Sequence, residues 1–250
     1  MTDAAGWSVR EDRLLGGRVR LLQPVQGYRA ATDPVFLAAA CPARAGETVL
    51  DLGCGAGAAA LCLAARVPVR PTGLELQEGY LALARKNAAL NGVEMTLHPG
   101  DVAAMPGALK ALSFDHVILN PPYFREQSLG SPIARKDLAH REAEGLEVWL
   151  AAARARLKPR GWLTLIHRAE RLDSILAGLT GTGDIAIKPL IARVGRDAKR
   201  VLVRARKDVK TPLRLCAPLV LHAGVAHTVD GDDFSPEAGA ILRDAAPIAF

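Results

Sequence analysis

A short buried strand that runs directly into a glycine-rich turn constrains the fold of this chain more than any other feature. Thr48–Leu52 is an apolar run, Gly53-Cys-Gly-Ala-Gly57 follows it, and the Ala/Leu-rich stretch 58–66 suits a helix. Glycine permits a sharp turn and a close approach of the backbone to a ligand, and the free N–H groups of a helix N-terminus lie just beyond it. The sequence therefore predicts a nucleotide-binding corner.

The remaining apolar runs alternate between strand-like and helix-like patterns. We expect an α/β fold with a mostly parallel sheet, helices on both faces and the ligand crevice at the carboxyl ends of the strands. Half of the 250 residues are apolar, which suffices for one substantial core, and no second domain is evident. Strands are expected at 71–76, 95–98, 114–119, 161–166 and 213–221, and helices at 34–40, 78–90, 142–157 and 236–244.

A second motif, Asn120-Pro-Pro-Tyr123, closes the strand expected at 114–119. Two prolines remove two backbone N–H groups, so the local backbone offers only carbonyl oxygens, while Asn120 adds an amide and Tyr123 a flat ring. This arrangement suits methylation of an amino group conjugated to a ring or a carbonyl, such as the exocyclic nitrogen of adenine. The Asn120 side-chain oxygen and the Pro121 carbonyl would accept its two hydrogens and face the charge that develops there. The alternative is a proline-rich loop after a buried strand.

The glycine turn alone does not separate two nucleotide cofactors. Its spacing also satisfies the dinucleotide fingerprint, and Glu75 stands where a ribose-binding acid is expected. Asp51, two residues before the first glycine, favours S-adenosylmethionine because its carboxylate can meet an ammonium group, and Asp101 is placed to contact an adenine. A turn or capping role is the alternative for both aspartates. The Asn120 motif has no evident use in a nicotinamide enzyme, so we expect S-adenosylmethionine.

These motifs together resemble the Rossmann-like, S-adenosylmethionine-dependent methyltransferases of the N6-adenine type. The resemblance covers roughly residues 46–170 and rests on four motifs: Asp51-Leu-Gly-Cys-Gly-Ala-Gly57, Thr72-Gly-Leu-Glu75, Gly100-Asp101 and Asn120-Pro-Pro-Tyr123. Within that group the chain is similar to bacterial enzymes that methylate N6 of adenosine 37 in valine tRNA. Gln26–Asp33, Asn-Pro-Pro-Tyr-Phe124 and Gly195–Val203 carry this narrower likeness.

The resemblance implies a set of site residues and a division of the chain. It implies catalytic roles for Asn120, Pro121, Pro122 and Tyr123. It implies cofactor contacts for Asp51, Gly53, Cys54, Gly55, Gly57, Glu75, Leu76, Asp101, Val102 and Asn120, and for Thr32 and Asp33 in a segment that closes over the donor. Helix capping is the competing interpretation of Thr32 and Asp33, and Pro34 departs from the family pattern. We expect a covering segment over 1–45, a methyltransferase domain over 46–207 and an extension packed on it over 208–250.

The resemblance also implies an antiparallel hairpin at the edge of the sheet, formed by strands over 185–192 and 199–205. Arg193–Lys207 is the most basic stretch of the chain, and the long loop Arg125–Arg141 is also basic. Both are candidates for phosphate contacts with RNA, tRNA being the expected RNA. An edge strand protected by charge and a solvated loop are the respective alternatives. The formal net charge of +6 is compatible with a polyanionic partner without requiring one.

Other features exclude or leave open further classes. The four cysteines form no C-x-x-C pair or metal-ligand pattern, and no leader or long apolar span is present, so we expect a cytoplasmic protein without bound metal. The tetrapeptide also serves enzymes that methylate a protein glutamine amide. Guanine-N2 methylation in ribosomal RNA, DNA adenine methylation and a non-enzymatic RNA-binding module remain alternatives. The sequence leaves monomer and dimer equally open.

Overall fold

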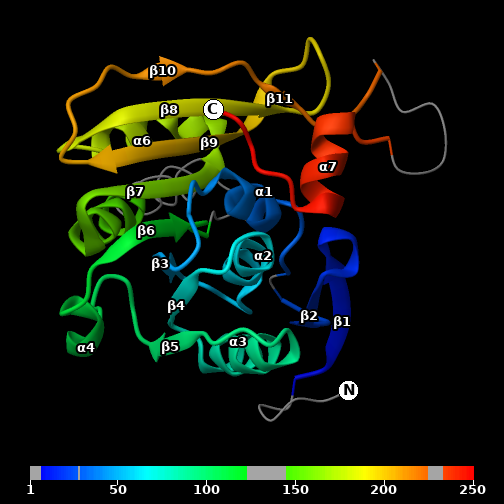
Figure 1. Cartoon of the computed structure of the whole chain (residues 1–250), viewed down its shortest axis with the longest axis vertical. Helices are drawn as coiled ribbons and strands as arrows, with labels where there is room; N and C mark the ends of the chain where they lie inside the picture. The colour runs from blue at the N-terminus through cyan, green and yellow to red at the C-terminus, as the bar shows by residue number, and fades with distance from the viewer. Residues whose placement is uncertain (1–6, 28, 123–144, 225–232) are drawn as a thin grey trace, which may run out of the picture.

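The computed structural model describes residues 7–27, 29–122, 145–224 and 233–250. In these residues a nine-stranded sheet runs in the order β10-β8-β9-β7-β6-β3-β4-β5, with β11 also paired to β8 (Figure 1). A separate antiparallel hairpin lies near the N-terminus. The expected α/β class with a mostly parallel sheet is confirmed.

Five parallel strands form the larger part of the sheet and reach one of its edges. They are β3 (Thr48–Leu52), β4 (Arg70–Glu75), β5 (Thr96–Pro99), β6 (Phe114–Leu119) and β7 (Leu157–Arg168). Only β7 differs much from expectation, since it begins four residues before the expected start at residue 161. Its register against β6 shifts between Phe114 and His116, and an irregularity of this kind is where a strand tolerates a proline such as Pro159.

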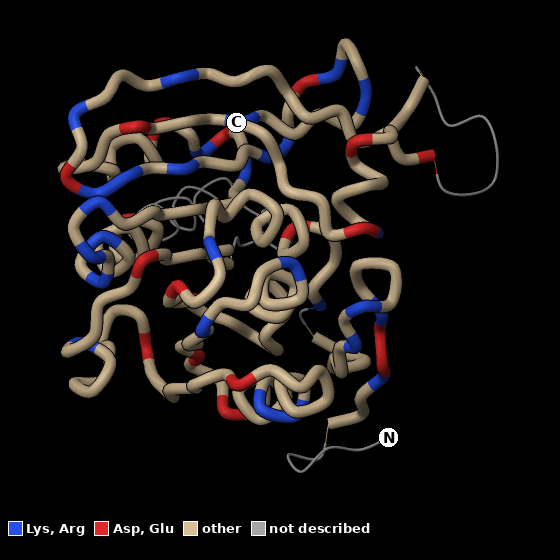
Figure 2. The backbone as a smooth tube through the Cα atoms, in the orientation of Figure 1, with Lys and Arg blue, Asp and Glu red and all other residues tan. Residues whose placement is uncertain are grey.

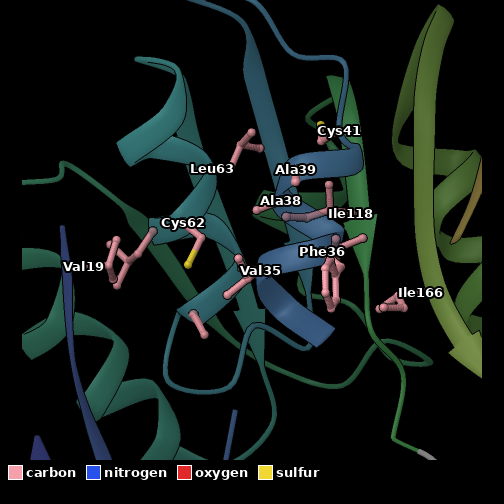
Figure 3. Close-up of a cluster of buried hydrophobic side chains, with 14 of the residues drawn as sticks. Val19, Val35, Phe36, Ala38, Ala39, Cys41, Cys62, Leu63, Ile118 and Ile166 are labelled. Carbon is pink, nitrogen blue, oxygen red and sulfur yellow. The ribbon is translucent and has the colours of Figure 1, made fainter. Parts of the chain in front are cut away.

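Helices cover both faces of the sheet, as expected. One face carries α1 (Asp33–Ala40), α2 (Ala58–Arg66), α3 (Glu78–Leu90) and α7 (Pro236–Asp244); the other carries α4 (Gly107–Lys110), a helix over 145–156 and α6 (Leu172–Gly178). Successive strand residues alternate between the two cores, because side chains alternate across a sheet. Figure 3 shows the first core, where Phe36 of α1 lies close to Ile118 of β6.

The hairpin of β8 (Thr182–Ile191) and β9 (Ala198–Lys207) is antiparallel, as the family resemblance implied. It is not the outermost element, because β10 (Arg214–Leu215) and β11 (Leu219–Val220) both add to β8 in parallel. The single strand expected over 213–221 is wrong. Leu215 and Leu219 oppose Ile187 and Leu190, so the chain carries one extra residue between the two pairings, and Pro218 lies within this bulge.

The N-terminal hairpin consists of β1 (Val9–Leu14), the 3₁₀ turn η1 (Leu15–Gly17) and β2 (Val19–Pro24). Two asparagines, one within α3 and one at its C-terminal cap, form hydrogen bonds with the backbone of β2 at its outer edge. The fully buried Asn87 accepts from Leu22 N at 2.7 Å and donates to Leu22 O at 3.0 Å, and Asn91 makes the same pair of bonds with Arg20. Asn87 also donates to Ala56 O at 2.9 Å, which ties the hairpin to the glycine turn.

The last helix packs back on the N-terminal half of the chain. Ser235 caps α7 by accepting from Ala238 N at 3.1 Å, and Ile241 joins the core that also contains Leu15. Ile248 N donates to Ala39 O at 2.9 Å. The boundaries at 45 and 207 stay predictions. Within the described residues, no helix combines the length and apolarity needed to cross a membrane.

Candidate active site

A pocket opens where the glycine turn, the Asn120 loop and the segment before α1 meet. The strands β3 and β6 are neighbours in register, Leu52 opposite Leu119, so the loops that follow them leave the same edge of the sheet. The pocket is lined by Gln23, Ala30, Pro34, Asp51, Gly53, Cys54, Gly55, Ala56, Ala58, Ala59, Tyr80 and Asn120. The predicted glycine corner and Asn120, the first residue of the tetrapeptide, therefore line one cavity.

The glycine turn has a backbone that only glycine adopts easily. Gly53, Gly55 and Gly57 have φ values of 65°, 55° and 87°, in the left-handed region. Gly57 is the N-cap of α2, and its N–H donates to Cys54 O at 2.8 Å. Cys54, the second residue of the turn, is buried and is one of the residues that line the pocket. The turn thus holds its backbone against the pocket, as the sequence pattern predicts.

Asp51 brings a buried carboxylate to the floor of the pocket. It is 3% exposed, it accepts from Ala60 N at 3.3 Å, and no salt bridge reaches it from the residues that the structure describes. Burial, together with the negative charge of Glu75, raises the pKa of Asp51 to about 7. Burial makes the charged carboxylate unfavourable, and a cationic ligand group such as an ammonium would stabilise it.

Glu75 ends β4 beside the glycine turn. Its two carboxylate oxygens accept from Gly55 N at 2.9 Å and from Gln77 N at 2.8 Å, which fixes the direction of the side chain. Leu76 follows it with 66% of its surface exposed, so a ligand bound at this edge of the sheet can reach it. The observed geometry fits a ribose and an adjoining base.

Asp101 and Val102 follow β5 at the same edge of the sheet. Asp101 Oδ1 accepts from Ala103 N at 2.9 Å, so the turn role weighed for it from the sequence is present in the structure. Val102 is buried in the core beneath. A contact of either residue with an adenine stays a prediction.

The Asn120 loop is described only in its first half. Asn120 lines the pocket, Pro121 is buried and Pro122 is exposed. Tyr123 lies outside the described residues, and so does the basic loop Arg125–Arg141.

Comparison with known proteins decides the family. The methyltransferase small domain family matches residues 32–182, which is more than half of the chain. The chain belongs to this methyltransferase family. It is 29% identical over 74% of its length to a tRNA1(Val) (adenine(37)-N6)-methyltransferase of Shewanella halifaxensis, covering 76% of that protein. It is 32% identical over 70% of its length to a protein of the same description from Aeromonas hydrophila, covering 75% of that protein.

Among solved structures, the methyltransferase resembles a predicted O-methyltransferase from Agrobacterium tumefaciens, with a TM-score of 0.69 and 27% identity. The likeness covers 87% of this chain and 99% of the other. The Rossmann-like fold and the use of S-adenosylmethionine as methyl donor follow from the family. The glycine turn, Asp51 and Glu75 fit this donor, since they offer backbone N–H groups and two carboxylates to its ammonium and ribose groups.

Donor affinity in this methyltransferase should depend on pH through Asp51. Its carboxyl is protonated below pH 7 when no donor is bound, and the protonated form cannot pair with the donor's ammonium group. We expect the dissociation constant to rise about tenfold for each pH unit below 7. Calorimetry between pH 5.5 and 7.5 measures this, and Asp51→Asn should bind weakly with a flat profile over this range. A flat profile in the wild type would contradict the assignment.

The segment before α1 is held over the pocket by a buried glutamine that sequence reasoning missed. Gln23 is 2% exposed; its amide accepts from Ala30 N at 2.6 Å and donates to Ala30 O at 3.2 Å and to Asp12 at 2.8 Å. Arg29 donates to the same Asp12 oxygen at 2.8 Å. These bonds fix the entry to α1, where Pro34 lines the pocket. An isolated glutamine in a strand carries no sequence signal for this role.

Thr32 and Asp33 make other contacts at the start of α1. Thr32 is the N-cap of α1 through its backbone carbonyl, which accepts from Val35 N and Phe36 N, and its side chain makes no capping bond. Asp33 accepts from Arg200 Nε at 3.1 Å, so its carboxylate links α1 to β9. Direct donor contacts by these two residues stay predictions.

Trp149 is the second residue that the sequence did not reveal. It lies on the helix over 145–156, and its ring packs so closely on Gly53 that an added Cβ there would approach the ring to 2.3 Å. The first glycine of the turn is thus required by a tertiary contact as well as by its φ. Trp149 is only partly buried, so it forms a wall beside the donor turn.

Lys and Arg recur along the backbone of Arg193–Lys207 (Figure 2), but several of their side chains are already engaged within the fold. Arg204 donates to Ala40 O and Ile248 O and stacks on Phe250 at 3.8 Å. Its neighbours Arg206 and Lys207 donate to backbone carbonyls of β7. Arg193 pairs with Asp233. These four serve the fold, so the candidates for phosphate contact on the hairpin narrow to Arg196, Lys199 and the partly exposed Arg200, which also pairs with Asp33.

Proposed function

We propose that the protein transfers a methyl group from S-adenosylmethionine to the exocyclic N6 of an adenine in RNA, with tRNA as the substrate and adenosine 37 of a valine tRNA as the target. The observation that carries this proposal is the shared pocket of Asp51, the glycine turn and Asn120. The relatives from Shewanella and Aeromonas are named for adenine 37 of a valine tRNA, which supports the choice of nucleotide. We place the protein in the cytoplasm, where such RNA is found.

The adenine nitrogen is a poor nucleophile because its lone pair is delocalised into the ring. Asn120 Oδ1 and the Pro121 carbonyl would accept its two hydrogens, which lets the nitrogen pyramidalise and attack the methyl group in line. The new C–N bond forms as the S–C bond breaks, and one proton then leaves the nitrogen for solvent. The buried Pro121 and the lack of N–H groups at 121 and 122 support a loop that only accepts hydrogen bonds.

The target base must leave its stack to enter this pocket. Tyr123 would hold it by stacking, an interaction worth roughly 1–3 kcal/mol per base in proteins that bind single strands. The anticodon loop offers unpaired bases, which lowers the cost of extruding one. A protein glutamine amide is the competing acceptor, because its nitrogen is conjugated in the same way.

One assay separates these substrates. The protein is incubated with donor labelled in its methyl group and with separate pools of tRNA, ribosomal RNA, DNA and protein, and the labelled product is digested to nucleosides or amino acids. We expect label in the tRNA pool, recovered as N6-methyladenosine. Label recovered as methylglutamine or 2-methylguanosine would overturn the proposal, and a lack of transfer to any pool would favour a binding module.

A further inference from the structure

Two arginines face each other across β7 and β9 at the edge of the sheet that holds the active site. Arg168 is the last residue of β7, and Arg200 is its direct partner in the antiparallel register. Partners in register project from the same face of a sheet, and like charges placed in this way destabilise the pairing. Arg171, at the end of the 3₁₀ turn η3 (Ala169–Arg171), adds a third cation three residues later.

We call these three residues the arginine cluster. Their positive charges act on one buried side chain. His167 is 3% exposed. Burial, together with the positive charges of Arg171, Arg200 and Arg168, lowers the pKa of His167 to about 4. His167 is therefore neutral at physiological pH and adds no charge to the cluster, in which Arg168 pairs with Glu170 and Arg200 pairs with Asp33.

The register of the sheet places the cluster beside the catalytic loop. Leu119 of β6 pairs with Leu165 of β7. Asn120 directly follows Leu119, and Arg168 lies three residues after Leu165. With strands about 4.8 Å apart and about 3.3 Å per residue, Arg168 lies on the order of 10 Å from Leu119. A nucleotide spans a comparable distance between its base amino group and its own backbone phosphate.

The cluster also contacts the segment that lines the donor pocket. Arg200 Nε donates to Asp33 at 3.1 Å, and the next residue, Pro34, is part of the pocket wall. Arg168 Nη1 donates to Glu170 at 2.8 Å, and the side chains of Arg200 and Arg168 remain 31% and 22% exposed, so a ligand can reach both of these paired arginines. Within the described residues, Arg171 Nε and Nη2 are buried with no hydrogen-bond partner, a cost that an anionic acceptor would relieve.

We propose that the arginine cluster is a binding site for the RNA backbone phosphates next to the target nucleotide. Guanidinium groups present a planar set of donors that matches phosphate oxygens, and three of them can hold successive phosphates on either side of an extruded base. The site rests on the proposed function and goes beyond it by locating the RNA on β7 and β9 rather than on the hairpin turn.

The test measures binding of a fluorescent, unmodified valine tRNA transcript by anisotropy over a range of salt concentrations. Arg168→Gln and Arg200→Gln should each weaken binding about tenfold, which is the expected loss of one charge-assisted contact. Each should also reduce the slope of log K against log salt by about 0.7, the contribution of one phosphate in a single strand. The dissociation constant for S-adenosylmethionine should stay within about twofold of wild type, a range far below the tenfold loss of one contact.

Two matched variants exclude a purely structural effect. Arg206→Gln makes the same change six residues after Arg200, on the same face of β9 but at the opposite edge of the sheet. It should leave the salt dependence of tRNA binding unchanged. Asp33→Asn removes the ion pair of Arg200 while keeping the arginine, so it should preserve the slope if Arg200 contacts phosphate directly.

The possible results distinguish failure of the phosphate site from failure of the proposed function. Unchanged tRNA slopes in both cluster variants would overturn the site, and so would a loss confined to donor binding. A wild-type protein that does not bind the transcript would overturn both proposals. Reduced slopes together with no N6-methyladenosine in the product would support the phosphate site and refute the proposed function alone.

Discussion

Asn120→Ala is expected to lower kcat for methyl transfer to tRNA by about 10²–10³-fold, the usual cost of removing one preorganised dipole that faces developing charge. Donor affinity should change little, because Asp51 and the glycine turn remain. Asn120→Asp keeps an oxygen acceptor at the same position and should retain more activity than the alanine variant. The measurement is single-turnover transfer at saturating donor, paired with calorimetry of donor binding.

The relative activities of Asn120→Asp and Asn120→Ala show which group of the Asn120 side chain matters. If Asp and Ala are equally inactive, the side-chain oxygen is not the group that matters, and the amide N–H becomes the candidate. If Asn120→Ala keeps near wild-type turnover on its RNA, the catalytic assignment of the tetrapeptide is wrong.

Gly53→Ala is expected to have the second largest effect, on stability and donor binding together. Its φ of 65° costs a non-glycine residue about 1–2 kcal/mol, and the new Cβ would meet the Trp149 ring at 2.3 Å. Overpacking of this kind adds about 1–3 kcal/mol, so we expect a loss of about 3 kcal/mol in the free energy of unfolding. Donor affinity should fall at least tenfold, since either the turn or the ring must move.

Two further variants separate the causes of this loss. Gly46 also has a positive φ, 81°, but a Cβ there would meet nothing within 4 Å, so Gly46→Ala should cost only the strain of about 1–2 kcal/mol. Adding Trp149→Ala to Gly53→Ala should recover part of the stability by making room. Chemical denaturation measures both, and a double variant that is no more stable than expected from the two single changes would contradict the Gly53–Trp149 contact.

The parts of the site that the sequence predicted are those with local causes. The strand, the glycine turn and α2 are contiguous, and their apolar spacing and positive φ requirements are visible in the residues themselves. α2 accordingly spans Ala58–Arg66, as expected, and β6 ends at Leu119, directly before the tetrapeptide. Parallel pairing of β3 and β6 then follows from alternation of strands and helices.

The parts that escaped prediction depend on contacts between distant residues. Gln23 and Ala30 meet across a turn, and Trp149 reaches Gly53 from a helix almost 100 residues later in the chain. The sequence correctly located the positive charge of β9, but it did not show which of the arginine side chains are already bonded within the fold. Arg204 lies at the centre of the strand and its guanidinium is used by α1 and the C-terminal residues, whereas Arg200 lies at the edge.

The central claim is that the pocket at Asn120 methylates N6 of one adenine in RNA. The most direct measurement compares two valine tRNA transcripts that differ only in carrying adenosine or guanosine at position 37, with methylation located by mass spectrometry of nuclease fragments. We predict close to one methyl group per adenosine transcript, recovered as N6-methyladenosine in the anticodon-loop fragment, and none in the guanosine transcript. Equal incorporation into both transcripts, or a methyl group on another base or outside that loop, would contradict the account.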